Sequence, residues 1–420
     1  MDVIQDLEFR GLLYQVTDRD GLAARLSKGP LTLYNGFDPT ADSLTIGNLV
    51  AILLLRRFQL AGNHPIGVVG GGTGLVGDPS GKNTERQLNE SEVVEEWTAK
   101  VRGQLSRFLD FEVKSNPARI VNNYDWLSQL GTLEFLRDVG KHFPVNYMLA
   151  KDSVSSRLDA GISFTEFSYM IMQSYDYLWL SENMGCELQT GGSDQWGNIT
   201  AGVDLIRRTR ALSVYGLTCP LVTNADGSKL GKTVAGAIWL DEQLTTPYQF
   251  YQYWMNSNDE DVVPYLKIFT FLSHSEIDEL AEEVKNKPWE RVAHRTLARE
   301  ATTLVHRKEA MIRAENISNA LFYGKVSDLT AGEIEEGLHD VPSYVIEGDS
   351  SVKLVDLLAE AKISPSKRRA REDIANGAIS VNDERCSDTE KVFVPADRLK
   401  GRYLVIRRGK SSYHLVKWNV

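Results

Sequence analysis

The segment LTLYNGFDPTADSLTIGNLVAILLLRRFQLAG, residues 31–62, places a short apolar run, a glycine-containing turn and a long apolar stretch in succession. LTLYNGF (31–37) predicts a strand that breaks at Gly36, and IGNLVAILLLRRFQLAG (46–62) predicts a helix closed by Gly62. HPIGVVGGGTG (64–74) follows as a second strand with a glycine-rich exit. Strand, helix and strand in this order form a βαβ unit, so we expect a parallel sheet in an α/β domain.

The rest of the chain changes character twice. Between residues 247 and 321 strand-like runs nearly vanish, and apolar residues recur at three- and four-residue spacing, which predicts helices. Beyond them, SPSKRRAREDIANG (364–377) predicts a helix and GRYLVIRRG (401–409) a strand. We therefore predict four segments, which are a parallel-sheet domain (1–246), an α-helical domain (247–322), a linker rich in Gly, Asp, Glu and Ser (323–351) and a small α+β module (352–420).

Charge is unevenly distributed. The 420 residues carry a formal net charge of −10, but residues 352–420 hold fifteen Lys or Arg against nine Asp or Glu, a local net charge of +6. An acidic body with a basic terminal module suggests that an anionic polymer binds at that end. A merely solvated basic surface is the alternative.

Cysteine spacing and hydropathy indicate the cellular compartment and whether the chain holds a structural metal. The three cysteines, Cys186, Cys219 and Cys386, are far apart and show neither a disulfide framework nor zinc-ligand spacing. The start, MDVIQDLEFRGLL, is acidic where a signal peptide needs basic residues, and no apolar run approaches the roughly 20 residues that span a bilayer. We expect a cytoplasmic protein with no structural metal and no membrane partner.

Two glycine-rich patterns suggest nucleotide sites of other classes. Gly72 to Gly77 matches GxGxxG, but a dehydrogenase needs an acidic residue at the end of a second strand about 20 positions on, where SEVVEEWTAK (91–100) has a helical pattern. DGSKLGKT (226–233) ends like a P-loop, yet Asp226 occupies the position of its first glycine. Both readings are disfavoured.

Two segments, residues 36–48 and 226–233, indicate a phosphate-binding site. GFDPTADSLTIGN (36–48) joins a strand to a helix start, where backbone N–H groups favour an anion. DGSKLGKT supplies Lys229 and Lys232 on a loop much further along the chain, from which they can approach a triphosphate.

These two segments resemble the HIGH and KMSKS signatures of class I aminoacyl-tRNA synthetases. Together with GDPSGK (77–82), GISFTEFSYMIMQSYDYLWL (161–180) and GGSDQWGNIT (191–200), they resemble bacterial tyrosyl-tRNA synthetases over essentially the whole chain. The resemblance implies a Rossmann-type catalytic domain, an α-helical anticodon-side domain and a small RNA-binding module. It also implies a homodimer, with its interface near Phe164, that joins L-tyrosine to ATP, with Mg²⁺ on the triphosphate, and then transfers tyrosine to tRNA(Tyr).

The resemblance assigns a tyrosine site. Tyr169, Gln173 and Asp176 are spaced i, i+4 and i+7, so they share one helix face. For an arbitrary helix a satisfied polar patch would be the simpler reading. By resemblance, Tyr34 and Asp176 bind the phenol hydroxyl, Asp78, Tyr169 and Gln173 hold the ammonium group, and Gln195 lies beside the carboxyl end.

The resemblance assigns the nucleotide site as well. Gly36, Asp38, Gly47, Gly192, Asp194 and Lys232 are expected to bind ATP or the adenylate. The groups expected to stabilise the reacting phosphates are Thr40, Thr45, Asn48, Lys82, Arg86, Lys229, Lys232 and Thr233. No general base is needed, because the tyrosine carboxylate is already ionised at neutral pH.

One signature departs from the family pattern. Thr45-Ile46-Gly47-Asn48 stands where HIGH is usual, and a threonine carries no charge towards the triphosphate. Asn35 and Ala51 also differ from the commoner residues near the nucleotide. TIGN occurs in tryptophanyl-tRNA synthetases, so a tryptophan enzyme is one alternative, which Tyr34 and Asp176 disfavour. A catalytically impaired paralogue that binds RNA or regulates is the other.

The RNA-binding residues are predicted from basic clusters. Lys367, Arg368 and Arg371 crowd one helix start, and Arg407, Arg408 and Lys410 follow a strand. Two solvated basic faces are the plainer reading, and the resemblance favours contact with tRNA phosphates. Arg207 and Arg208 are predicted to serve the acceptor stem.

Overall fold

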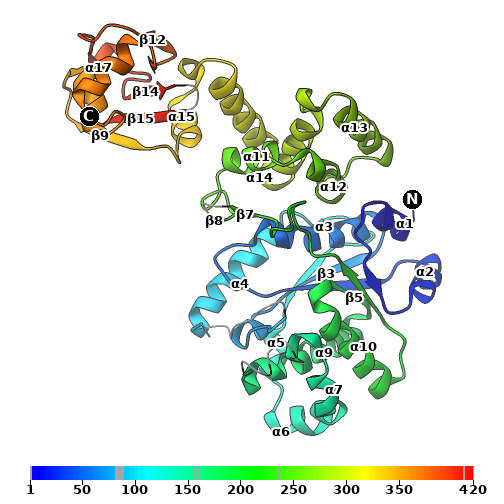
Figure 1. Cartoon of the computed structure of the whole chain (residues 1–420). Coiled ribbons are helices and arrows are strands. Elements are labelled where there is room, and N and C mark those ends of the chain that lie inside the picture. Colours follow the sequence, from blue (N-terminus) through cyan, green and yellow to red (C-terminus); the bar gives the residue numbers. More distant parts are fainter. Residues whose placement is uncertain are drawn as a thin grey trace. The chain divides into compact units, whose positions relative to one another are not determined.

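Most of the chain is described by the computed structural model, which covers residues 2–80, 89–155, 158, 161–233, 236–409 and 412–419. The chain divides into two compact units, one formed by residues 1–245 and 256–305 and the other by residues 246–255 and 306–420 (Figure 1). Each unit has a core of its own.

The first unit is built on a six-stranded sheet with the strand order β1-β6-β5-β2-β3-β4. Five strands are parallel, and β1 pairs antiparallel with β6. The bounds are β1 (Gln15–Val16), β2 (Thr32–Phe37), β3 (His64–Val69), β4 (Arg119–Asn122), β5 (Cys186–Gly192) and β6 (Tyr215–Cys219). The predicted parallel sheet is confirmed, and the runs expected at 31–37 and 64–74 are β2 and β3.

The strand order fixes where a ligand can bind. From β2 the chain moves to β3 on one side, and β5 lies on the other side of β2. The carboxyl ends of β2 and β5 therefore border a crevice that no crossover helix covers, the usual ligand position in open parallel sheets. Helix α3 (Ile46–Leu60) begins beside this crevice, with Thr45 as its N-cap residue.

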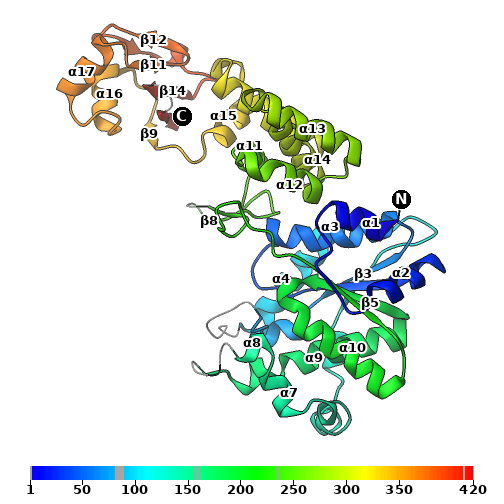
Figure 2. The ribbon, with the colours of Figure 1, turned by 45° about the vertical axis from the view of Figure 1, so that its right-hand side comes forward.

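Helices cover both faces of the sheet (Figure 2). α3 and α4 (Ser91–Leu105) pack on one face, and α9 (Phe164–Met184) and α10 (Trp196–Arg210) pack on the other. The shorter helices of this part are α1 (Val3–Phe9), α2 (Arg19–Ser27), α5 (Tyr124–Leu127), α6 (Thr132–Glu134), α7 (Val145–Leu149) and α8 (Asp152–Ser155).

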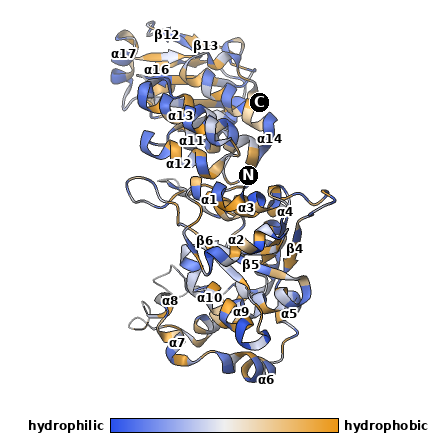
Figure 3. Ribbon diagram, turned by 90° about the vertical axis from the view of Figure 1, so that its right-hand side faces the viewer, coloured by the Kyte–Doolittle hydropathy of each residue, from blue (hydrophilic) through white to orange (hydrophobic). Residues whose placement is uncertain are grey.

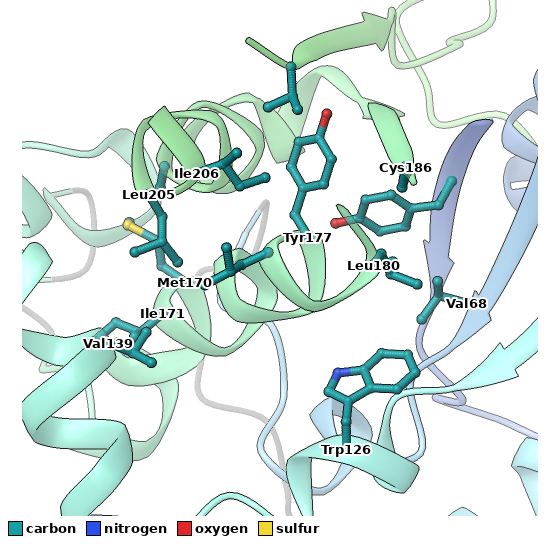
Figure 4. Packing of buried hydrophobic residues seen from close by; sticks show 14 of the residues in the cluster. Val68, Trp126, Val139, Met170, Ile171, Tyr177, Leu180, Cys186, Leu205 and Ile206 are labelled. Atoms are coloured by element: carbon teal, nitrogen blue, oxygen red, sulfur yellow. The ribbon is translucent and has the colours of Figure 1, made fainter. Parts of the chain in front are cut away.

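Helix α9 runs through a core made by residues distant in the sequence. Met170, Tyr177 and Leu180 of α9 pack with Trp126 from the segment after β4 and with Val68 of β3 (Figure 4). Ser163 caps the start of α9 by accepting a hydrogen bond from the Glu166 amide, and the end is closed by Gly185 with a φ of 64°. This packing fixes the face of α9 that carries the predicted polar residues.

Residues 247–322 are helical, as predicted. Within the first unit lie α12 (Asp259–Phe269), α13 (His274–Asn286) and the beginning of α14 (Val292–Phe322), whose helical backbone is interrupted at Arg307. α11 (Pro247–Met255) and the end of α14 belong to the second unit. The contacts thus divide this segment between both units.

The second unit contains a five-stranded sheet with the order β12-β11-β14-β15-β9, in which only β9 pairs in parallel. α16 (Leu354–Glu360) and α17 (Lys367–Ala375) pack on it through an apolar core, and the ribbon of α17 is largely hydrophilic (Figure 3). The remaining bounds are α15 (Ala331–Gly337), β9 (Ser343–Glu347), β10 (Val352–Lys353), β11 (Ile379–Val381), β12 (Glu384–Cys386), β13 (Val392–Phe393), β14 (Tyr403–Arg408) and β15 (Ser412–Asn419).

The predicted linker, residues 323–351, is not a structureless connector. It contains α15 and the edge strand β9, which pairs with β15 from Leu415↔Ser343 to Asn419↔Glu347. An edge strand needs only one apolar face, and β9 alternates between exposed and half-buried residues. The strand SYVIE is short and lies among residues rich in Gly, Asp, Glu and Ser, so the whole segment was predicted as a linker.

None of the helices in the described part of the chain combines the length and the apolar character that a membrane crossing requires.

Candidate active site

A cavity of about 520 Å³ opens at the carboxyl ends of β2 and β5. It is lined from segments as far apart as β2, the start of α3, the middle of α9 and the turn after β5. Among its lining residues are Tyr34, Gly36, Asp38, Thr40, Thr45, Gly47, Asn48, Asp78, Tyr169, Gln173, Asp176, Gly192, Asp194, Gln195 and Lys229. The structure therefore brings most of the predicted site residues into one place.

Tyr34 lies in a buried part of the cavity. This side chain is 2% exposed, and its hydroxyl is buried without a hydrogen-bond partner among the described residues. Its ring packs 5.4 Å from the ring of Tyr177. Burial raises the pKa of Tyr34 well above its usual value, so the hydroxyl keeps its proton. A buried hydroxyl that lines a cavity with nothing to bond is poised for a polar group of a ligand.

Asp176 lies in the same region on α9 and is 4% exposed. Its two oxygens accept hydrogen bonds from Trp126 Nε1 at 2.7 Å and from Asn123 Nδ2 at 2.9 Å. Burial raises the pKa of this carboxyl to about 7, although both donors act in the opposite direction. The ring of Trp126 is held in turn by stacking on Trp179, with ring centroids 4.2 Å apart.

A chain of hydrogen bonds links Asp176 to Asp38. Asn123 Nδ2 also donates to Thr73 Oγ1 at 2.9 Å, and Thr73 Oγ1 donates to Asp38 Oδ1 at 2.7 Å. The Tyr169 hydroxyl donates to the second oxygen of Asp38 at 2.7 Å. The two carboxylates are thus fixed by one network.

Gly70 makes room for this network. A Cβ at this position would lie 1.9 Å from Asp38 Oδ1 and 2.5 Å from Thr73 Oγ1. Glycine is therefore required here by the close approach of side chains, at an exit that the sequence pattern alone marked only as glycine-rich.

A second network lies on the other side of the cavity. Gln195 Nε2 donates to Asp78 Oδ2 at 2.6 Å, and Asn198 Nδ2 donates to Gln173 Oε1 at 3.0 Å and to Gln195 Oε1 at 3.2 Å. Asp194 lies beside this group, and burial, with the nearby charge of Asp78, raises its pKa. Acceptors therefore converge here and favour a cationic ligand group.

The start of α3 also lines the cavity, through Thr45, Gly47 and Asn48. Asn48 Oδ1 accepts from the Thr45 backbone amide at 2.9 Å and from Thr45 Oγ1 at 3.0 Å. Since the oxygen of this amide is in use as an acceptor, its nitrogen is the atom left to donate to an anion. Added Cβ atoms would meet nothing within 4 Å at Gly36 and only Thr45 Oγ1, at 3.5 Å, at Gly47. That space is available to a ligand.

Residues 223–233, which we name the lysine loop, also border the cavity. Lys229 is exposed and lines the cavity, whereas Lys232 is exposed but lies at the start of β7 (Lys232–Thr233), outside the lining. β7 pairs with β8 (Gly236–Ala237). The predicted residues Lys82 and Arg86 and the side chain of Thr233 lie outside the described residues.

The predicted acceptor-stem arginines are exposed at the end of α10. Both are paired with one carboxylate, since Asp204 accepts from Arg207 at 2.7 Å and from Arg208 at 2.6 Å. They lie outside the cavity.

The basic residues of the second unit differ in solvent exposure and in whether a buried carboxylate binds them. Arg368 is 91% exposed and forms a surface ion pair with Glu372 at 3.2 Å, and Arg371 is also exposed. Arg408 instead binds the buried Asp373 at 2.8 Å and donates to the Ile363 carbonyl at 2.9 Å.

The other members of this basic set are also placed. Lys367 pairs with Asp356 at 2.8 Å, and Arg407 lies over the ring of Tyr413 at 5.9 Å. Lys410 lies outside the described residues.

Sequence reasoning missed several residues of the site. Thr73, Asn123 and Asn198 supply hydrogen bonds to predicted residues, and Trp126 supports Asp176. Asn123 lines the cavity and follows directly on β4, and its place at the carboxyl end of a parallel strand was the available signal.

A second hollow, of about 720 Å³, lies beside α13 and is lined by Glu276, Asp278, Glu279, Glu282 and Glu283. Five acids without a cation among the lining residues repel phosphates, so this hollow does not compete as a nucleotide site. In the described part of the chain no cluster of three or more His, Cys, Asp or Glu side chains is arranged to hold a metal ion.

The chain matches two family models. Residues 26–323 match the model of class I tRNA synthetases (W and Y), and residues 333–416 match a tyrosine–tRNA ligase SYY-like C-terminal domain. The second model is specific to tyrosine enzymes, although the first one covers tryptophan enzymes as well.

Its curated relatives match over the full length. The chain is 59% identical over 419 residues to the tyrosine–tRNA ligase of Bacillus caldotenax and to that of Geobacillus stearothermophilus, with all of both chains covered. It is 55% identical to tyrosine–tRNA ligase 1 of Bacillus subtilis, with 99% of each chain covered.

Solved structures agree in fold. A C-terminally truncated mitochondrial tyrosyl-tRNA synthetase of Aspergillus nidulans matches with a TM-score of 0.70 and 31% identity, covering 76% of this chain and 94% of that one. A tryptophanyl-tRNA synthetase of Encephalitozoon cuniculi matches with a TM-score of 0.54 at 14% identity, covering 74% of this chain and 87% of that one, and shows the shared fold.

The raised pKa of Asp176 predicts a pH-dependent stability. Between the ordinary pKa of 3.8 and about 7, the folded protein keeps a proton that the unfolded chain has lost. Asp176 should therefore lower the free energy of unfolding by up to about 1.4 kcal/mol per pH unit across this window and have no further effect above it. The Asp176→Asn variant should lack this slope.

Urea unfolding of both proteins between about pH 5 and about pH 9 measures the difference. Asp20→Asn, at a side chain that is 100% exposed, is the matched control and should run parallel to the wild type. A difference between wild type and Asp176→Asn that does not change with pH would mean that Asp176 ionises normally.

Proposed function

The chain belongs to the bacterial tyrosyl-tRNA synthetases of class I, and we propose that the cavity at the carboxyl ends of β2 and β5 is where it joins L-tyrosine to ATP. The protein is a tyrosine–tRNA ligase, and the alternative of an impaired paralogue is not favoured. The tryptophan alternative is disfavoured by the tyrosine-specific C-terminal match.

One observation carries the proposal. The buried Tyr34 hydroxyl, which has no hydrogen-bond partner among the described residues, lines the same cavity as the buried Asp176 carboxylate. A phenol entering the cavity can accept a hydrogen bond from Tyr34 and donate one to Asp176. Phenylalanine would leave the buried Tyr34 hydroxyl unpaired and would offer Asp176 no further donor, the principle of selection for which tyrosyl-tRNA synthetases are the standard example. The ionised form of Asp176 is the better acceptor, and the substrate hydroxyl would add a third donor to it.

The amino end of the substrate fits the acceptor-rich side of the cavity. Asp78, Tyr169 and Gln173 surround the space proposed for the ammonium group, and their orientations are set by Gln195, Asp38 and Asn198 respectively. In this arrangement Gln195 also lies beside the carboxylate of the substrate.

MgATP is the second substrate, since enzymes of this family use ATP. The open space at Gly36 and Gly47 suits the nucleotide, and Gly192, Asp38 and Asp194 border it. The triphosphate would meet the start of α3, where the helix dipole favours anions. Phosphate contacts are proposed for Thr40, Asn48, Lys82, Arg86, Lys229, Lys232 and Thr233, and Thr45 is proposed to support the contact made by Asn48.

Catalysis then rests on position and charge. The tyrosine carboxylate attacks the α-phosphorus, the bond to the β-phosphate oxygen breaks, and pyrophosphate leaves with the negative charge that develops. Thr45 donates its hydroxyl to Asn48, so the proposal assigns the phosphate contact to the Asn48 amide and gives Thr45 the role of orienting it.

Contact with tRNA is proposed for the basic residues of the second unit. Arg368 and Arg371 are the best candidates, because an exposed guanidinium can leave a weak surface pair for a phosphate. Arg408 serves mainly to neutralise the buried Asp373, and Lys367, Arg407 and Lys410 complete the predicted surface. Arg207 and Arg208 remain candidates for the acceptor stem.

A homodimer is proposed from the apolar surface around α5 to α9. Leu133 is 83% exposed, Phe164 74% and Val145 61%, and Tyr124, Leu136, Leu149 and Leu158 are exposed in the same part of the chain. Such a concentration of large apolar side chains is typical of a protein interface.

Tyr34→Phe tests the tyrosine pocket. The variant should lose about two- to tenfold in its preference for tyrosine over phenylalanine, because one hydrogen bond to the phenol is removed. The measurement is amino-acid-dependent ATP–pyrophosphate exchange. Tyr177→Phe, which deletes a buried hydroxyl bonded to the Tyr215 carbonyl, is the control and should keep the preference. Exchange driven by tryptophan rather than tyrosine would overturn the assignment.

Deleting the residues after Tyr323 should abolish charging of tRNA(Tyr) while tyrosine activation persists. The cut precedes α15 and β9, because a cut at 350 would leave β9 without its sheet partner. In the full-length chain, Arg368→Gln with Arg371→Gln should raise the KM for tRNA several-fold and leave exchange unchanged. Simultaneous loss of activation and charging in the double variant would count against separate functions.

Phe164→Asp should convert the dimer into a monomer, because a carboxylate cannot be desolvated cheaply in an apolar interface. Light scattering after size exclusion measures the mass. Leu60→Asp, at a leucine that is 61% exposed on α3, is the matched control and should stay dimeric. A wild-type protein that is monomeric at micromolar concentration would refute the proposal.

A further inference from the structure

Helix α12 of the first unit contacts the lysine loop at its base. The loop narrows where Thr223 and Lys229 form an antiparallel bridge, and the turn between them is closed by hydrogen bonds from the Asn224 amide to the Ser228 carbonyl, at 2.9 Å, and from Asn224 Nδ2 to Ser228 Oγ, at 2.6 Å. Asn224 is therefore the residue that sets the shape of the turn before Lys229.

The first contact from α12 orients this asparagine. The Tyr265 hydroxyl donates to Asn224 Oδ1 at 2.6 Å, and the tyrosine itself is 2% exposed. Because the oxygen of the amide is bonded to Tyr265, its nitrogen must face Ser228. One buried hydroxyl thus fixes which way the side chain that closes the turn is directed.

The second contact holds the backbone next to it. Asp261 Oδ1 accepts from the Ala225 amide at 2.7 Å, and its other oxygen accepts from Asn258 Nδ2 at 3.1 Å. Asp261 is 5% exposed in the first turn of α12, where the helix dipole favours a negative charge. A hydrogen bond from a backbone amide to a buried carboxylate is stronger than one to a neutral acceptor.

The other end of α12 is anchored to the catalytic sheet domain. Arg10, the C-cap residue of α1, donates to the carbonyls of Lys267, Thr270 and Leu272 at 2.9, 3.3 and 2.7 Å. Arg57 of α3 donates to the Ile268 and Thr270 carbonyls at 3.1 and 2.6 Å. Both guanidinium groups are buried, and Asp6 pairs with each of them.

The lysine loop also touches the start of α3. The Ile238 amide donates to the Gly231 carbonyl at 2.9 Å, and the Ile46 amide donates to the Ile238 carbonyl at 3.1 Å. A Cβ added to Gly231, whose φ is 72°, would lie 2.2 Å from the side chain of Ile46. The lysine loop therefore contacts both α12 and the start of α3, and Arg57 of α3 links these two helices.

We propose that Asp261 and Tyr265 are positioning residues for the activation step, through which α12 holds the base of the lysine loop in the place that presents Lys229 and Lys232 to the triphosphate. The inference rests on the proposed function of these lysines. Neither Asp261 nor Tyr265 lines the cavity, so the proposed effect on the lysines passes through Ala225 and Asn224.

The variants Asp261→Asn and Tyr265→Phe in the full-length protein test the proposal. In tyrosine-dependent ATP–pyrophosphate exchange, we expect kcat/KM for ATP to fall about tenfold or more for Asp261→Asn and about threefold for Tyr265→Phe, from the loss of a charged and a neutral hydrogen bond. The dissociation constant of tyrosine measured without ATP should be unchanged. Trypsin should cut after Lys229 or Lys232 faster in both variants, as identified by mass spectrometry.

Asp259→Asn is the matched control, because it removes a carboxylate from the same first turn that pairs with Arg291 and His294 rather than with the loop. It should leave trypsin cleavage and ATP kinetics as in the wild type. Weaker tyrosine binding together with a lower unfolding temperature in Asp261→Asn and Tyr265→Phe would show a merely structural role and overturn the proposal.

Two further outcomes separate this inference from the proposed function. If Lys229→Ala and Lys232→Ala lose exchange while the α12 variants do not, the role of α12 is refuted and the lysine assignment stands. If the lysine variants keep full exchange, the lysine assignment itself fails, whatever the rate of trypsin cleavage in the α12 variants.

Discussion

The burial of the Asp176 carboxylate is the constraint around which the active-site half of the protein is arranged. A buried acid is tolerated only with donors around it, and here the donors come from Trp126 and Asn123. Because Asn123 also bonds Thr73, and Thr73 bonds Asp38, the same requirement fixes the exit of β3 and the turn after β2. The buried carboxylate thereby helps to fix α9 relative to the carboxyl ends of β2, β3 and β4.

The cavity lining combines hydrogen-bond acceptors with groups that favour anions. Asp78 and Gln173 border the space proposed for the ammonium group, and the N-terminus of α3 and Lys229 line the same cavity. A zwitterion and a triphosphate have opposite electrostatic requirements, and this one lining supplies groups for both. Arg57 and Arg10 do not line the cavity. They donate hydrogen bonds to the carbonyl groups at the end of α12, where cations are favoured.

The second unit shows that a basic composition does not by itself identify phosphate contacts. Arg408 lies in the predicted cluster, yet it neutralises the buried Asp373 and so holds α17 against the sheet. Arg368 on the same helix is almost fully exposed. The distinction depends on where the carboxylates lie, which residue spacing does not reveal.

The sequence alone determined the parallel sheet, the helical segment, the family and most of the cavity residues, because strand and helix periodicity are local and the signature residues recur at fixed spacing. It also placed Tyr169, Gln173 and Asp176 on one helix face, since 3.6 residues per turn fixes that geometry. It did not determine that 343–347 is a strand, because an edge strand is defined by its neighbour β15. Nor did it identify Asn123, Trp126, Asp261 or Tyr265. Only the tertiary structure decided these roles, because a hydrogen bond between residues far apart in the chain leaves no periodicity in the sequence.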